Sequence, residues 1–177
     1  LVHTLDGSTQ DSWWSAMSMA GLINTLEQIY KAGGAVNPTL SSATKHWDNI
    51  WVSRYYSWHS GSFKSGYTRV GYYKLKKDAP NDAVDILSKS VIVPLLEKML
   101  ADGAIHEYEI DTQALHTEAP GEFLIVYIAS SAEGLDKVDA AVAALGKSQA
   151  LLGPAFGSMT DSTAHRDDLS RTNATYK

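Results

Sequence analysis

The stretch that decides the fold is EFLIVYIA, residues 122–129. Every residue after Glu122 is apolar, so both alternating faces of an extended chain would be apolar here. A strand with two apolar faces is typical of the centre of a sheet that is covered on both sides. The sequence therefore predicts that 122–129 is a central, fully covered strand.

Outward from this strand, the pattern alternates between strand and helix. The apolar spacing predicts a strand at 67–76, a helix at 82–102, a strand at 104–111, a helix at 132–145 and a final short strand. This order is that of the split βαβ arrangement, a ferredoxin-like α+β sandwich with an antiparallel sheet and helices on one face. Right-handed crossovers place 122–129 between 67–76 and 104–111. The second face then needs a cover, either the N-terminal segment or a second subunit.

The N-terminal part, residues 1–66, is predicted to be an extension packed on a core domain of residues 67–177. Apolar residues at helical spacing predict a helix from Ser12 to Lys31, capped by Asp11 or Ser12 and stopped at Gly33-Gly34. Residues 46–58 are rich in aromatic and β-branched types and predict an added strand.

Two residues inside the predicted core elements interrupt the regular pattern. Pro94 is expected either to kink the helix at 82–102 or to start a second helix there. Gly71 marks a bulge or a close backbone approach within the strand at 67–76.

The composition limits the classes of function. A chain of 177 residues with 44% hydrophobic and 20% charged residues can bury a core and is not intrinsically disordered. A net charge of −5 argues against a nucleic-acid partner, which would favour a basic surface. The absence of cysteine excludes disulfides, thiolate metal sites and a cysteine nucleophile. No apolar run has the length of a membrane span.

The first residue, Leu1, is not a methionine, which suggests trimming. Removal of a secretory signal peptide would give a soluble periplasmic or secreted protein, and the sequence favours this over a cytoplasmic one. The alternative explanation for Leu1 is that the sequence simply starts at an arbitrary position.

The element order resembles that of the dimeric α/β-barrel superfamily, in which two ferredoxin-like sheets pack face to face. The resemblance covers residues 67–177 and rests also on GYYKLKKD (71–78), LEKMLADGAIHEYEID (96–111) and GEFLIVYIA (121–129). That superfamily includes cofactor-free quinone monooxygenases, haem-degrading proteins, lactone isomerases, polyketide cyclases and ligand-sensing domains. The resemblance implies a homodimer with a site between the open sheet face and the helices.

His106 and Tyr108 are the candidate catalytic residues. They share one face of the predicted strand at 104–111, and a histidine that titrates near neutral pH can act with a tyrosine as a general acid/base pair. The alternative is a partly exposed strand histidine without a catalytic role. A metal site is not expected, because His106 and Glu109 point to opposite faces.

The candidate ligand-binding residues combine aromatic rings with polar groups. Rings can stack on an aromatic ligand, while a guanidinium group can fix its carboxylate or phenolate. Packing of an edge strand with its polar tips in water is the alternative. The candidates are Arg54, Tyr55, Trp58, His59, Tyr72 and Tyr127.

Near the C-terminus, AHRDD (164–168) combines a histidine with two aspartates, which could orient the imidazole as a base. A solvated helix end is the alternative. The sequence contains none of the phosphate-loop, dinucleotide, zinc-protease or serine-hydrolase motifs.

Taken together, these patterns predict a small-molecule-binding protein or cofactor-independent enzyme of the dimeric α/β-barrel type, acting on an aromatic or polyketide-like ligand. No cofactor is expected. The alternatives are a non-catalytic interaction module without a cavity and a haem-binding protein.

Overall fold

The computed structural model describes residues 2–4, 10–32, 38–45, 48–59, 65–115 and 119–172. The chain divides into two compact units, one of residues 1–11 and 50–177 and the other of residues 12–49. The extension predicted at 1–66 is thus shared between the units, since its first and last parts cluster with the later residues.

The larger unit is built on an antiparallel sheet with the strand order β2-β1-β7-β4-β6-β5-β3. The fold class is α+β, as the sequence predicts. In chain order the strands are β1 (Val2–Thr4), β2 (Gln10–Asp11), β3 (Trp51–Trp58), β4 (Gly66–Lys74), β5 (Glu107–Gln113), β6 (Glu122–Ala129) and β7 (Arg166–Thr172).

The predicted central position of residues 122–129 is confirmed. β6 pairs with β4 on one side, where Val70 lies opposite Val126, and with β5 on the other, where Ile110 lies opposite Ile125. The side chains on the two faces of β6 belong to two separate apolar clusters. Phe123 and Tyr127 pack towards the helices, while Leu124 and Val126 pack with Val70 on the opposite face.

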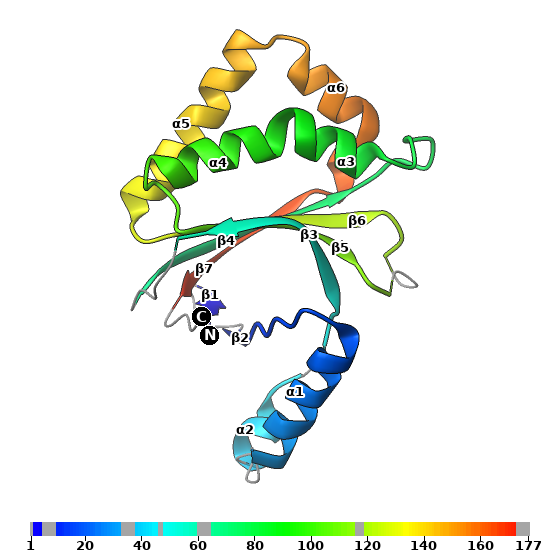
Figure 1. Cartoon of the computed structure of the whole chain (residues 1–177), viewed down its shortest axis with the longest axis vertical. Coiled ribbons are helices and arrows are strands. Elements are labelled where there is room, and N and C mark those ends of the chain that lie inside the picture. The colour runs from blue at the N-terminus through cyan, green and yellow to red at the C-terminus, as the bar shows by residue number, and fades with distance from the viewer. Residues whose placement is uncertain are drawn as a thin grey trace. The chain divides into compact units, whose positions relative to one another are not determined.

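The helices α3 (Ala83–Leu87), α4 (Val93–Ala101), α5 (Ala132–Ser148) and α6 (Leu152–Met159) lie on one face of the sheet (Figure 1). The main core lies between this helical layer and the sheet. Its most deeply buried large side chains include Phe123, Ile105 and Ile110. These apolar contacts are the principal source of stability expected for the unit.

The irregularity predicted at Pro94 is present and has a clear geometry. A π-helical turn, Ser88–Ile92, links α3 to α4, and Pro94 occupies the first turn of α4. The helical backbone runs without a break from Ala83 to Ala101, and Pro94 follows the π-helical turn directly, where the regular hydrogen-bond pattern is already interrupted. α4 ends at Ala101, and Gly103 follows its cap with a φ of 69°, the left-handed conformation that glycine adopts easily.

Two further elements lie outside the strands and helices expected from the sequence. The segment 152–159 contains two glycines and a proline, residues typical of loops, yet it forms the helix α6. Within residues 1–11, Val2–Thr4 form β1 and Gln10–Asp11 form β2, and β1 pairs with β7.

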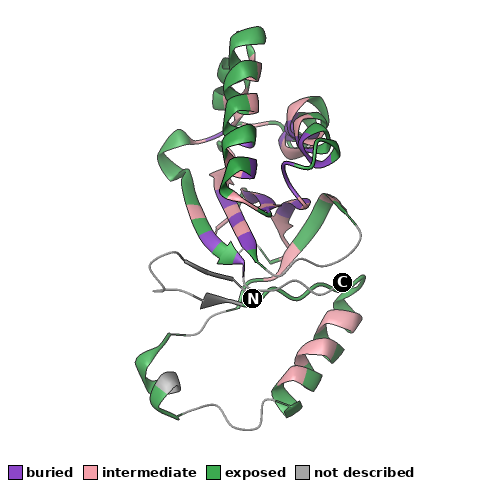
Figure 2. Cartoon of the chain, turned by 90° about the vertical axis from the view of Figure 1, so that its left-hand side faces the viewer, coloured by how far each residue is buried: buried purple, intermediate pink, exposed green. Residues whose placement is uncertain are grey.

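The smaller unit contains α1 (Met19–Ala32) and α2 (Pro38–Ala43). The helix expected from Ser12 begins seven residues later, because Ser18 provides the cap by accepting a hydrogen bond from the Gly21 amide at 3.1 Å. The predicted stop at Gly33-Gly34 lies outside the described residues. No described residue of α1 is buried, as Figure 2 shows.

Candidate functional site

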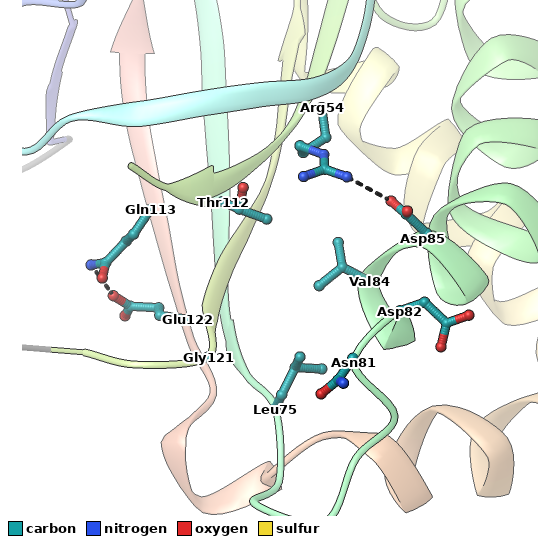
Figure 3. A pocket seen from close by; sticks show the side chains of 10 residues that line it. All are labelled: Arg54, Leu75, Asn81, Asp82, Val84, Asp85, Thr112, Gln113, Gly121 and Glu122. Atoms are coloured by element: carbon teal, nitrogen blue, oxygen red, sulfur yellow. Dashed lines mark hydrogen bonds and ion pairs between the residues drawn. The ribbon is translucent and has the colours of Figure 1, made fainter. Parts of the chain in front are cut away.

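A polar pocket lies where the end of β5, the start of β6 and the N-terminal part of α3 meet (Figure 3). It has a volume of about 260 Å³ and a partly apolar lining to which Val84 and Leu75 contribute. Its polar lining consists of Arg54, Asn81, Asp82, Asp85, Thr112, Gln113 and Glu122. All of these residues belong to the larger unit.

Arg54 reaches this pocket because of an irregularity in β3. The pairing of β3 with β5 shifts between Ser53 and Tyr55, which leaves Arg54 as the extra residue of a bulge. A bulge redirects a side chain that would otherwise point to the opposite face from its neighbour. Arg54 Nη2 lies 3.4 Å from Asp85 Oδ1, and the Tyr55 hydroxyl donates to the same oxygen at 3.0 Å. Two consecutive residues thereby converge on one carboxylate.

Gln113 and Glu122 lie at the rim of the pocket, and their side chains share the sheet face turned away from the helices, on which Asp111 and Leu124 also lie (Figure 3). Gln113 Nε2 donates to Glu122 Oε2 at 3.1 Å, and this fixes the orientation of the amide, because a flipped amide would place two acceptors together. The amide oxygen, Gln113 Oε1, is buried and has no hydrogen-bond partner among the described residues. A buried acceptor without a donor is rare in proteins and calls for a specific reason.

The charges of the lining define the ligands that would suit it. Asp82, Asp85 and Glu122 carry three carboxylates, against the single guanidinium of Arg54, which Asp85 already engages. The pocket therefore offers more acceptors than donors. Such a lining favours a ligand that brings donors, such as an amine or a molecule with several hydroxyl groups.

His106 and Tyr108, the predicted acid/base pair, do not line this pocket. Tyr108 belongs to the helix-side core, is 2% exposed, and donates its hydroxyl to Glu97 Oε1 at 2.6 Å. Burial, followed by the Glu97 carboxylate, raises the pKa of Tyr108. The His106 ring lies 6.2 Å from that of His59, whose Nε2 is 2.7 Å from the Leu100 carbonyl oxygen. A catalytic role for the pair stays a prediction.

The predicted aromatic ligand-binding residues lie on two faces of the sheet. Tyr127 belongs to the helix-side core, where burial raises its pKa, and Tyr55 packs against that core. Tyr72 packs on the opposite face, with the Arg166 guanidinium 3.7 Å above its ring centre. Trp58 stacks on Tyr56 at 5.6 Å between ring centres. Of the predicted ligand-binding set, Arg54 alone is among the residues that line the pocket.

A second polar cluster joins β4, β7 and α5. Its histidine, His165, stacks on Tyr73 with 4.4 Å between ring centres. His165 Nδ1 is 2.9 Å from the Tyr72 carbonyl oxygen, and Nε2 is 3.3 Å from Asp167 Oδ2. The two ring nitrogens therefore lie beside oxygens from two different strands, β4 and β7.

The cluster extends from Asp167 to α5. Arg69 bridges Asp167 at 3.3 Å and Asp139 at 3.0 Å, and burial, with Asp167 as a further cause, raises the pKa of Tyr73 to about 12. Gly71 permits the close approach that its position suggested, because a Cβ atom there would lie 2.8 Å from Tyr73 Cε2.

The His–Asp contact considered at 164–168 is present, and the helix-end alternative holds for Ala164 and His165, which end a short 3-10 helix (Ser162–Ala164). Residues 166–172 form a strand, in which residues two apart share a face. The side chains of Arg69, His165 and Asp167 are about a third exposed, as expected of a surface ion network.

Gln113 and Glu122 were not singled out from the sequence. They lie nine positions apart and are brought together by the hairpin of β5 and β6. The signal that could have found them is that both terminate predicted strands at the same edge of the sheet.

Within the described ranges, no three His, Asp or Glu side chains gather as a metal site, and no helix is long and apolar enough to cross a membrane. Comparison with family models, with curated proteins and with solved structures finds no match to this chain.

Proposed function

We propose that this chain is a small-molecule-binding protein that holds a polar, donor-rich ligand in the pocket between Arg54 and Glu122. The observation that carries the proposal is the charge of the pocket lining, in which carboxylates outnumber the single guanidinium of Arg54. A ligand amine or hydroxyl would donate to these carboxylates. The aromatic or polyketide-like ligand expected from the sequence stays a prediction, since the aromatic candidates lie on two faces of the sheet.

The pocket is prepared for binding by its internal contacts. Asp85 holds Arg54 and Tyr55, and Glu122 holds the Gln113 amide, so that these side chains lose little further freedom when a ligand enters (Figure 3). A volume of about 260 Å³ lies just below the range typical of sites for drug-sized ligands and suits a small metabolite. The site contains no evident nucleophile with an activating base, so binding is favoured over catalysis.

The proposal is tested by titrating the chain with small amines and polyols, namely ethanolamine, putrescine and glycerol, followed by NMR. We expect one class to shift the backbone amide signals of Asp82 and Asp85. Asp82→Asn keeps the volume and removes a negative charge from the lining, and should weaken binding by about tenfold or more, since a hydrogen bond to a charged group contributes about 1.5–3 kcal/mol. Asp136→Asn, at an exposed aspartate on α5, is the matched control. Equal affinity of Asp82→Asn and the parent chain would contradict the proposal.

We also propose that the β4–β7 region has the ferredoxin-like arrangement and forms a homodimer of the dimeric α/β-barrel type. The order β7-β4-β6-β5 and the helices on one face support the first part. The second part rests on the resemblance of the element order to that superfamily, because Val70, Leu124 and Val126 on the opposite face are already buried within one chain. In such barrels, that face is the one turned towards the partner subunit.

The dimer has a direct test. We expect the chain to sediment at micromolar concentration with about twice its monomer mass of 19.2 kDa. A monomer under these conditions would rule out the dimer and leave the ligand proposal standing, because every pocket residue comes from one chain.

A further inference from the structure

A second hollow, the α3 groove, adjoins the pocket along α3 and the π-helical turn that follows it. It has a volume of about 480 Å³ and is lined by Asp82, Asp85, Ile86, Lys89 and Ser90. Asp82 and Asp85 also line the pocket itself. A ligand held by these two carboxylates can therefore extend from the pocket into the groove.

The lining of the α3 groove follows one face of the helix. Asp82, Asp85, Ile86 and Lys89 are separated by three, four and seven positions, the spacing at which helical residues share a face. Asp82 and Lys89 lie about 10 Å apart along the helix axis, given a rise of about 1.5 Å per residue. Ile86, which is 39% exposed, lies between them. The groove thus presents carboxylates, an apolar side chain and an ammonium group in this order.

At the carboxylate end, Asp82 is available to a ligand. It precedes α3, yet its side chain makes no capping hydrogen bond and has no ion pair among the described residues. Figure 3 shows its carboxylate pointing away from Gln113 and Glu122. An amine at this end of the groove would therefore find an acceptor that no described side chain occupies.

At the other end, Lys89 is an exposed cation without an ion pair to any described carboxylate. Asp85 precedes it by four residues, a spacing that allows an ion pair within a regular α-helix. Asp85 is held instead by Arg54 at 3.4 Å and by the Tyr55 hydroxyl at 3.0 Å. The π-helical turn that begins at Ser88 also interrupts the regular spacing. Lys89 can therefore bind an anionic group of a ligand.

We propose that the ligand is an ω-amino acid, a zwitterion with an extended aliphatic chain between its ammonium and carboxylate groups. This inference rests on the proposed function, since the ammonium group donates to the carboxylates of Asp82 and Asp85 that line the pocket. The ligand carboxylate binds Lys89, and the aliphatic chain packs on Ile86. A zwitterion of this length matches the charges at both ends of the groove, whereas a simple amine matches only one.

The test compares 6-aminohexanoate, pentylamine and glycine. Pentylamine has the aliphatic chain of 6-aminohexanoate without the carboxylate, and glycine carries both charges too close together to reach from Asp82 to Lys89. Binding is followed by NMR through the backbone amide signals of these two residues. We expect 6-aminohexanoate and pentylamine to shift the Asp82 signal and 6-aminohexanoate to shift the Lys89 signal more. Glycine should bind more weakly than 6-aminohexanoate.

Lys89→Glu gives a readout of opposite sign for the two ligands. The variant repels the ligand carboxylate, so it should weaken binding of 6-aminohexanoate by about fivefold. It should not weaken binding of pentylamine, because the new negative charge attracts the ammonium group. Lys147→Glu, in the last turn of α5, is the matched control and should leave both affinities unchanged.

The outcomes separate this inference from the proposed function. If Lys89→Glu binds 6-aminohexanoate as tightly as the parent chain does, or if glycine binds as tightly as 6-aminohexanoate, the inference is overturned and the proposed function stands. The same holds if glycerol shifts the Asp82 signal at millimolar concentration while 6-aminohexanoate and pentylamine do not. If none of the amines and polyols shifts that signal, both are overturned.

Discussion

Gly134→Ala lowers the free energy of unfolding by about 2–3 kcal/mol, the upper part of the range for overpacking a tight site. Alanine is ordinarily the better helix former, so the usual expectation has the opposite sign. At Gly134, in the first turn of α5, a Cβ atom would lie 2.3 Å from the Ala104 carbonyl oxygen and 3.1 Å from the Ala129 Cβ. The first of these atoms is backbone, and the Ala104 amide is itself bonded to the Met99 carbonyl at 2.9 Å. The clash therefore cannot be relieved by turning a side chain.

The same helix offers the control. Gly146, near the end of α5, has no atom within 4 Å of the position of an added Cβ. Gly146→Ala should therefore raise the free energy of unfolding by about 0.5–1 kcal/mol, through helix propensity alone. Urea unfolding of the two variants and the parent measures both effects. If both substitutions changed stability in the same direction, the close packing of α5 on residue 104 would be refuted.

Asp111→Asn is expected to have a pH-dependent effect of comparable size. Asp111 lies on β5 and is 2% exposed, and this burial raises its pKa in the folded chain to about 6 from the ordinary value of 3.8. A raised pKa gives stability that is fully present below pH 3.8 and is lost as the pH rises through 6. A difference of roughly two pKa units corresponds to about 3 kcal/mol, lost by the parent chain between acidic and neutral pH.

Asparagine does not titrate, so the unfolding free energy of the variant does not fall with pH for this reason. The difference in unfolding free energy between Asp111→Asn and the parent should therefore move in favour of the variant by up to about 3 kcal/mol from pH 4 to pH 8. Chemical unfolding at pH 4, 6 and 8 provides the measurement, with Asp136→Asn as the exposed control. A difference that stays constant with pH would mean that Asp111 is not buried as described.

The main layers of the fold could be predicted because they follow from local periodicity. The two apolar faces of residues 122–129 required a central strand, and β6 has these limits in the structure. The helix α6 was missed because Gly153 and Pro154 look like loop residues. A proline in the first turn of a helix is tolerated, however, since the amide it lacks has no intrahelical acceptor there.

The candidate site was less accessible from the sequence. Arg54 was predicted as a ligand-binding residue. The direction of its side chain depends on the bulge in β3, however, and no local sequence pattern specifies that bulge. Gln113 and Glu122 meet through the register of β5 and β6, a property of the whole hairpin. The position of the His165 ring likewise depends on a carbonyl group from β4. Each of these features depends on contacts between segments that are neighbours in the fold but distant in the sequence.

The pairing of β7 sets an order in which the larger unit can be completed. β7 pairs with β4 on one side and with β1 on the other, where Val2 lies opposite Thr172. Contacts between residues so far apart in the chain form late, because the loop that they close is long. During synthesis, the residues of β1 emerge before those of β7 and have no β7 to pair with until residue 172 has been made. A chain cut before β7 would therefore leave β1 and β4 without the strand that lies between them.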